Sequence, residues 1–167
     1  HHDINNTNSQ NVLDNSASVC NLLDLASKVK GKADVLIAIT DAEEICSFTS
    51  SGSKRLARLI AYYGTNVKEA INLELTAFGT TRVADHPSKI LDSSFNVIHT
   101  PFNDSAVLRS CGIPSVCINI LPPKDTQMAI KGKHPPTWML CHSDDDVFEN
   151  AVEEDMTVFV NYLASVV

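Results

Sequence analysis

Two glutamates stand next to each other where an apolar run ends, and this pair is the first sign of chemistry in the sequence. In the stretch DVLIAITDAEE, residues 35–40 precede Asp41 and Ala42, and Glu43 and Glu44 follow. Each carboxylate makes ionisation of its neighbour less favourable, most of all beside apolar groups. A pair of this kind on a helix or loop surface is usually solvated. At the carboxyl end of a strand, where α/β folds gather ligands, it indicates a functional site.

Other side chains able to bind a metal follow expected strands or stand at the start of the chain. They are His1, Asp3, Asp14, Glu74, His142 and Asp146. Five cysteines without a C-x-x-C pair indicate neither a disulfide framework nor a thiolate zinc site. Oxygen and nitrogen ligands suit zinc or another divalent first-row metal in an open, catalytic geometry. Two such ions would need one bridging carboxylate and separate terminal ligands.

The elements that must position these side chains alternate along the chain. Apolar periodicity and end signals predict helices over residues 14–31, 51–64, 103–112 and 150–166. Continuous apolar runs predict strands over residues 34–40, 70–75, 95–100 and 115–120. Apolar strands interleaved with amphipathic helices predict an α/β fold, with a mostly parallel, mixed central sheet covered by helices on both faces.

Composition limits the classes of protein that the chain could belong to. Its 167 residues, 44% hydrophobic and 20% charged, fit a single domain with an ordinary core. A formal net charge of −7 argues against a nucleic-acid partner. No apolar run in the sequence approaches the length of a membrane span.

The order of the motifs resembles a known family. H-x-D, D-N-x-S, E-E, N-L-[D/E], G-I-P and H-x-x-x-D follow one another over nearly the whole chain. This order resembles the co-catalytic zinc aminopeptidases, a group that also includes glutamate carboxypeptidase and, as a single-zinc relative, glutaminyl cyclase. The resemblance implies a zinc-exopeptidase-like fold with two zinc ions. It also implies hydrolysis of a peptide or aminoacyl substrate by a zinc-activated water and a glutamate general base.

The same resemblance implies a role for each candidate residue. Glu43 resembles the general base, and Glu44 resembles the metal ligand beside it. Asp14 resembles the carboxylate that bridges the two ions. The remaining implied roles are terminal ligands at His1, Glu74 and His142, and supporting acids outside the ligand set at Asp3 and Asp146. His86, His99 and His134 belong to none of these motifs, and we expect them to be structural or surface residues.

Departures from the family pattern keep other hypotheses open. The family's domain usually has strands before H-x-D, whereas this sequence, taken as one domain over residues 1–167, opens on that motif. His1 and His2 also match the remnant of a purification tag. One alternative is therefore a non-catalytic relative that serves as a binding module. Another is a glutaminyl-peptide cyclase with one zinc, for which Trp138 would line the aromatic pocket.

Overall fold

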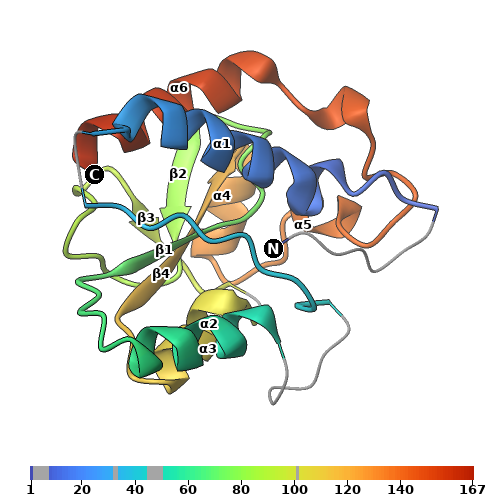
Figure 1. Ribbon diagram of the computed structural model, residues 1–167. Coiled ribbons are helices and arrows are strands. Elements are labelled where there is room, and N and C mark those ends of the chain that lie inside the picture. The colour runs from blue at the N-terminus through green and yellow to red at the C-terminus, as the bar shows by residue number, and fades with distance from the viewer. Residues whose placement is uncertain (2–7, 32–33, 45–50, 101) are drawn as a thin grey trace.

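The computed structural model describes residues 1, 8–31, 34–44, 51–100 and 102–167 (Figure 1). In this part of the chain a four-stranded sheet has the order β1-β4-β2-β3. Its strands are β1 (Ala70–Leu73), β2 (Thr81–Ala84), β3 (Asn96–Val97) and β4 (Ser115–Leu121). β1 pairs parallel with β4, β2 pairs parallel with β3, and β2 and β4 are antiparallel. The sheet is therefore mixed.

Helices cover both faces of this sheet. They are α1 (Ala17–Val29), α2 (Gly52–Tyr62), α3 (Asp104–Ser110), α4 (Pro123–Ile130), α5 (Pro136–Leu140) and α6 (Glu153–Val166). A π-helical turn, η1 (Val12–Ser16), precedes α1, and a 3-10 turn, η2 (Phe148–Asn150), precedes α6. α1 and α6 lie together on one side, and α2 and α3 lie together on the other (Figure 1). None of the helices that the structure describes combines the length and apolar composition needed to cross a membrane.

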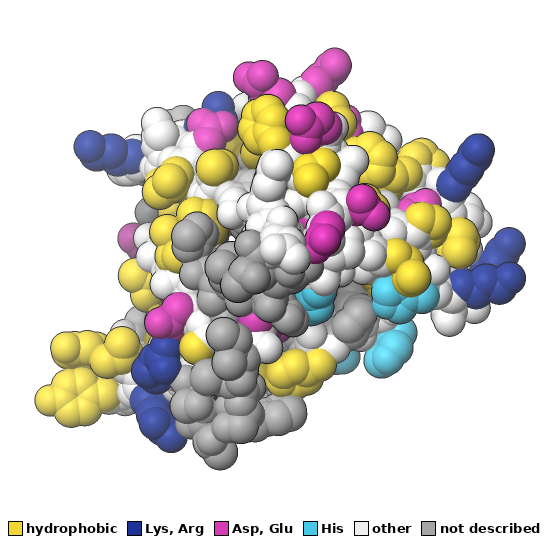
Figure 2. Space-filling view, turned by 90° about the vertical axis from the view of Figure 1, so that its right-hand side faces the viewer, with side chains coloured by type: hydrophobic (Ala, Val, Ile, Leu, Met, Phe, Trp, Pro, Cys, Tyr) yellow, Lys and Arg dark blue, Asp and Glu magenta, His cyan; other side chains and the backbone are white. Residues whose placement is uncertain are grey.

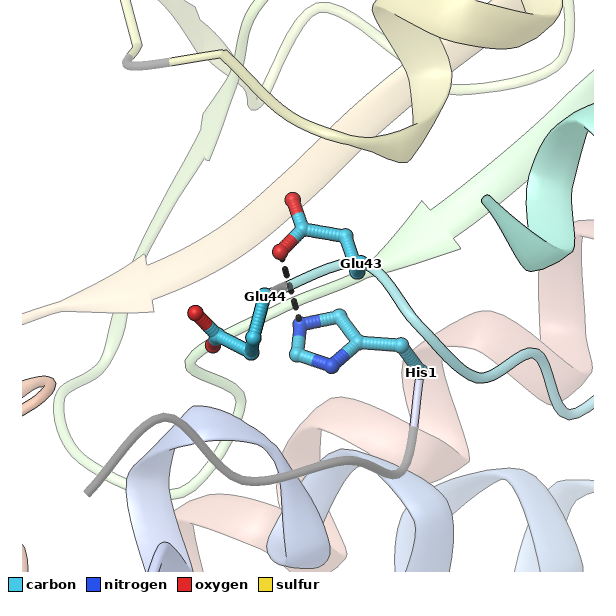
Figure 3. A group of neighbouring side chains, drawn as sticks. All are labelled: His1, Glu43 and Glu44. Carbon is cyan, nitrogen blue, oxygen red and sulfur yellow. Dashed lines mark ion pairs between the residues drawn. The ribbon is translucent and has the colours of Figure 1, made fainter. Parts of the chain in front are cut away.

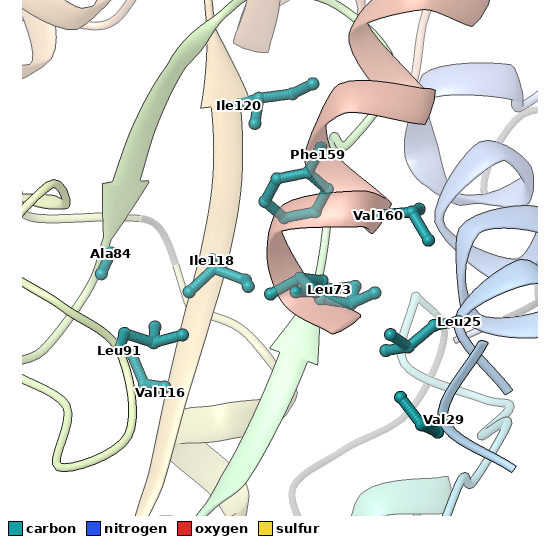
Figure 4. Close-up of a cluster of buried hydrophobic side chains, with 11 residues drawn as sticks. Leu25, Val29, Leu73, Ala84, Leu91, Val116, Ile118, Ile120, Phe159 and Val160 are labelled. Carbon is teal, nitrogen blue, oxygen red and sulfur yellow. The ribbon is translucent and has the colours of Figure 1, made fainter. Parts of the chain in front are cut away.

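The core is built on β4, in which all seven residues are buried. Successive side chains of a strand point to opposite faces, so Val116, Ile118 and Ile120 share one face. On that face they join buried side chains of α1 and α6, among them Leu25 and Phe159 (Figure 4). The alternate residues of β4 face the other way, and two of them line the pocket described below.

The predicted α/β fold is confirmed, and the helices expected at residues 14–31, 51–64, 103–112 and 150–166 correspond to α1, α2, α3 and α6. The prediction of a strand at residues 34–40 is wrong, because these residues pair with no strand in the part of the chain that the structure describes. Leu36 is 71% exposed and Ile39 is 50% exposed. An apolar pattern reports a tendency to be buried, whereas a strand also needs a neighbour that supplies hydrogen bonds.

Three elements were missing from the sequence-based prediction. β2 has only four residues and lies in a polar stretch that lacks a clear period. α4 and α5 fall in the proline-rich region, and each has proline in its first turn. Proline is tolerated there because the first amides of a helix have no partner inside it. Pro123 and Pro136 therefore mark the starts of these two helices.

Candidate metal centre

His1, His142 and several carboxylates meet in one pocket of about 360 Å³. His1, Asp14, Glu43, Glu74 and His142 all line it. Figure 2 shows histidine side chains gathered on one face of the molecule, near acidic side chains. The structure thus brings together residues from both ends of the chain and from the segment that follows β1. Asp3 lies outside the described residues.

The Asp14 carboxylate lies between the two histidines. Its Oδ1 is 3.4 Å from His1 Nε2, and its Oδ2 is 3.0 Å from His142 Nε2. His142 Nε2 is also 3.0 Å from the Glu44 carboxylate. The side chain of His1 is almost fully buried, and its Nε2 lies 3.9 Å from the Glu43 carboxylate. Figure 3 shows this ion pair as a dashed line. One carboxylate with its two oxygens aimed at two different imidazoles has the arrangement expected of a bridging ligand.

Contacts of the irregular turn η1 fix the position of Asp14. The backbone of Asp14 is not helical (φ −121°, ψ 85°), so amides in this turn need partners from elsewhere. The fully buried carboxylate of Asp146 supplies them, accepting from Leu13 N at 2.7 Å and from Asp14 N at 3.1 Å. Asn15 Nδ2 donates to the carbonyl of Leu73, the last residue of β1. Asp14 is therefore tied both to the segment that carries His142 and to the strand that precedes Glu74.

Backbone conformations with positive φ accumulate around the pocket. Ala42 (φ 54°) precedes Glu43, Leu75 (φ 50°) follows Glu74, and His142 itself has φ 62°. Residues other than glycine rarely adopt this region because Cβ then crowds the backbone. Such strain persists only where the surrounding structure imposes it, and it is typical of functional sites.

Charges in the pocket shift the pKa values of His1 and His142 upward. Burial by itself would lower the pKa of His1, but the hydrogen bond to Asp14 and the charges of Glu74 and Glu43 raise it to about 10. The hydrogen bond to Asp14 is the main reason that the pKa of His142 rises to about 9. Burial would raise the pKa of Asp14, yet the two histidines hold it well below its usual range. In the metal-free protein the imidazoles therefore act as counter-cations for the carboxylates.

Two of the carboxylates, Glu43 and Glu74, have raised pKa values and therefore resist ionisation. Burial raises the pKa of Glu43 to about 7, and the charge of Glu44 adds to the shift against the opposing charge of His1. Burial also raises the pKa of Glu74 to about 8, although Asn72 Nδ2 donates to its Oε1 at 2.7 Å. Crowded carboxylates that resist ionisation near neutral pH are expected where a cation would relieve their repulsion.

The donor atoms have the chemistry and spacing that zinc requires. Among the described residues, two groups place their donor atoms within 4.8 Å of one another: His1, Glu43 and Glu44, and Asp14, Glu44 and His142. Ligand atoms bound tetrahedrally to one zinc ion at about 2.1 Å lie about 3.4 Å apart. In the second group His142 Nε2 lies 3.0 Å from both Asp14 and Glu44, close to that spacing, and in the first group His1 Nε2 lies 3.9 Å from Glu43. The residues present therefore fit a zinc centre, although Glu74 joins neither group.

The wall of the pocket consists mostly of residues outside the sequence motifs. They include Thr100, Phe102, Asn103, Cys117, Asn119, His134, Trp138 and Met139. His134, expected to be structural or on the surface, lines the pocket with its ring centroid 5.2 Å from that of Trp138. Most of these side chains come from loops and short elements, so neither periodicity nor spacing could identify them. Trp138 carried a signal, through its nearness to His142 in the sequence.

We propose that Asp146 orients the Asp14 carboxylate, and its replacement by asparagine tests this. Asparagine would set an NH2 group against a backbone N–H, so at least one of the bonds to Leu13 and Asp14 would be lost. We expect zinc affinity to fall about 10–100-fold, measured by competition with a chelating dye. The exposed neighbour Asp145 gives the control, because Asp145→Asn leaves those bonds intact. Equal zinc affinity in both variants would contradict the proposal.

Solved structures share this fold. A zinc aminopeptidase from Bacillus subtilis (BSAP) superposes with a TM-score of 0.67 at 13% identity, covering 96% of this chain and 42% of that one. The aminopeptidase from Aneurinibacillus sp. strain AM-1 gives a TM-score of 0.69 at 14% identity, covering 99% and 41%. The chain therefore has a zinc aminopeptidase-like fold and spans about two fifths of each of these proteins. No family model and no curated protein matches the sequence.

Proposed function

We propose that the protein is a zinc-dependent exopeptidase of the aminopeptidase type, which removes the first residue of a peptide. The observation that carries the proposal is the Asp14 carboxylate placed between His1 and His142, with the Glu43–Glu44 pair beside it. The zinc aminopeptidase-like fold supports it. Asp14, Glu44 and His142 would hold one ion, and His1, Asp14 and Glu74 would hold the other.

Bound zinc would supply a Lewis acid for the scissile carbonyl and lower the pKa of a water molecule. Glu43 would accept a proton from the attacking water and pass it to the leaving amine. It suits this task because it lines the pocket and, in the metal-free protein, has a pKa of about 7. The free α-ammonium group of a peptide would bind among the carboxylates. Neither Lys nor Arg is among the described residues that line the pocket, so nothing there favours a substrate carboxylate.

A second candidate function is cyclisation of amino-terminal glutamine, which Trp138 in the pocket wall favours. Imidazoles on both sides of one carboxylate favour two ions instead, and cyclisation as found in the single-zinc relatives needs one. The products distinguish the two activities, because hydrolysis releases an amino acid whereas cyclisation releases ammonia.

The test combines zinc content with substrate choice. We expect about two zinc ions per chain by elemental analysis, and tighter binding at pH 8 than at pH 6, because zinc must displace the protons held by His1 and His142. An aminoacyl anilide should be hydrolysed, whereas its N-acetyl counterpart, which lacks the free amine, should not. Equal hydrolysis of both substrates, or none of either by the zinc-loaded protein, would overturn the proposal.

A further inference from the structure

We propose that helices α2 and α3 position the Glu43–Glu44 pair by holding Thr40 and Asp41, the residues that lead into it. This inference rests on the proposed function, because that function gives Glu43 and Glu44 their roles. The residues that would position the pair do not themselves line the pocket. The sequence predicted both helices but gave neither of them a role at the site. Thr40, Asp41, Gly52 and Asp104 are positioning residues in this account, because each would act only through the glutamates.

The first residue of α2 holds Asp41 from one side. Gly52 N donates to the carbonyl oxygen of Asp41 at 2.8 Å. A Cβ atom on Gly52 would lie 2.5 Å from that oxygen and 2.6 Å from the Asp41 nitrogen, closer than real Cβ atoms come. Only glycine lets the backbone of α2 approach Asp41 this closely. The ion pair between Arg55 and Asp41 also joins the two, but both side chains are well exposed and the pair adds little.

The first residue of α3 holds the preceding residue. Thr40 Oγ1 donates to Asp104 Oδ2 at 2.9 Å, and Asp104 is only 3% exposed. No donor among the described residues reaches the other oxygen of this carboxylate, Oδ1. Among the described residues, the Thr40 hydroxyl is therefore the side-chain donor that offsets the cost of burying the Asp104 carboxylate. Loss of this bond would be costly, because a buried carboxylate needs hydrogen bonds.

Ala42 connects the residues held by α2 and α3 to the glutamate pair. It lies between the held Asp41 and Glu43, and its left-handed conformation (φ 54°) turns the chain sharply. Beyond that turn, Glu44 meets His142 at 3.0 Å and Glu43 lies 3.9 Å from His1. A catalytic or ligating group must be held within roughly 0.5 Å of its productive position. The contacts at Thr40 and Asp41, three and two residues before Glu43, would restrain the chain that leads to that position.

A matched pair of substitutions at Thr40 tests the proposal. Thr40→Val keeps the shape but removes the hydroxyl, whereas Thr40→Ser keeps the hydroxyl. We expect Thr40→Val to weaken zinc binding about 10–100-fold and to lower kcat more than it raises KM. Thr40→Ser should restore both quantities. Thr65→Val, at an exposed threonine beyond α2, is the control for the substitution itself.

Zinc affinity separates this proposal from the function on which it rests. If Thr40→Val and wild type bind zinc equally and share one kcat, the positioning role is wrong. The same conclusion follows if Thr40→Ser fails to restore zinc affinity while Thr65→Val leaves it unchanged. If zinc-loaded wild type hydrolyses no aminoacyl substrate but Thr40→Val still weakens zinc binding, positioning stands and the aminopeptidase proposal fails.

Discussion

Replacement of Glu43 by glutamine is expected to lower kcat on aminoacyl substrates by about 10²–10⁴-fold while zinc content stays unchanged. Glutamine keeps the size and polarity of glutamate but cannot accept a proton. Glu43 lines the pocket beside His1, in the position proposed for the general base. Elemental analysis gives the zinc content, and steady-state kinetics on the same preparation gives kcat.

Glu44→Gln is the matched control for that experiment, because it makes the same chemical change one residue further along. The Glu44 carboxylate lies 3.0 Å from His142 Nε2 and belongs to both candidate donor groups. We expect this variant to lose zinc affinity and to recover part of its activity when excess zinc is added. If both variants lost metal, or both kept it and lost the same rate, the proposed division of roles would be wrong.

Removal of the Asp14 side chain should have the largest effect on metal content. The carboxylate faces His1 with one oxygen and His142 with the other, so Asp14→Ala would take a ligand from both proposed ions. We expect the zinc content to fall from about two ions per chain to below one, measured by elemental analysis of protein purified without chelator.

Asp24→Ala is a suitable control for this variant. Asp24 belongs to α1, its side chain is about half exposed, and among the described residues its ion-pair partner is Lys28, one turn away. An exposed pair of this kind contributes little to stability. Unchanged zinc content in Asp14→Ala, relative to this control, would exclude the bridging role.

Much of the fold could be predicted because local signals agreed with the final packing. The apolar face predicted over residues 14–31 became α1, with Leu25 and Val29 buried against α6. The run that became β4 is buried throughout. The segment at residues 34–40 shows where this logic fails. Its apolar residues suggested a buried strand, but strand pairing depends on neighbours that a local pattern cannot specify.

The sequence by itself determined which residues have the chemistry for a zinc centre and in what order they occur. Residue type and motif order are local properties, so Glu43, Glu44, Asp14 and both histidines could be named without coordinates. Only the tertiary structure decided that Asp14 lies between His1 and His142, and that Glu44 meets a histidine 98 residues away. It alone placed Asp146 against the amides of η1, and α2 and α3 behind the glutamate pair. These contacts join segments that are distant in the chain, and only packing of the whole domain brings them together.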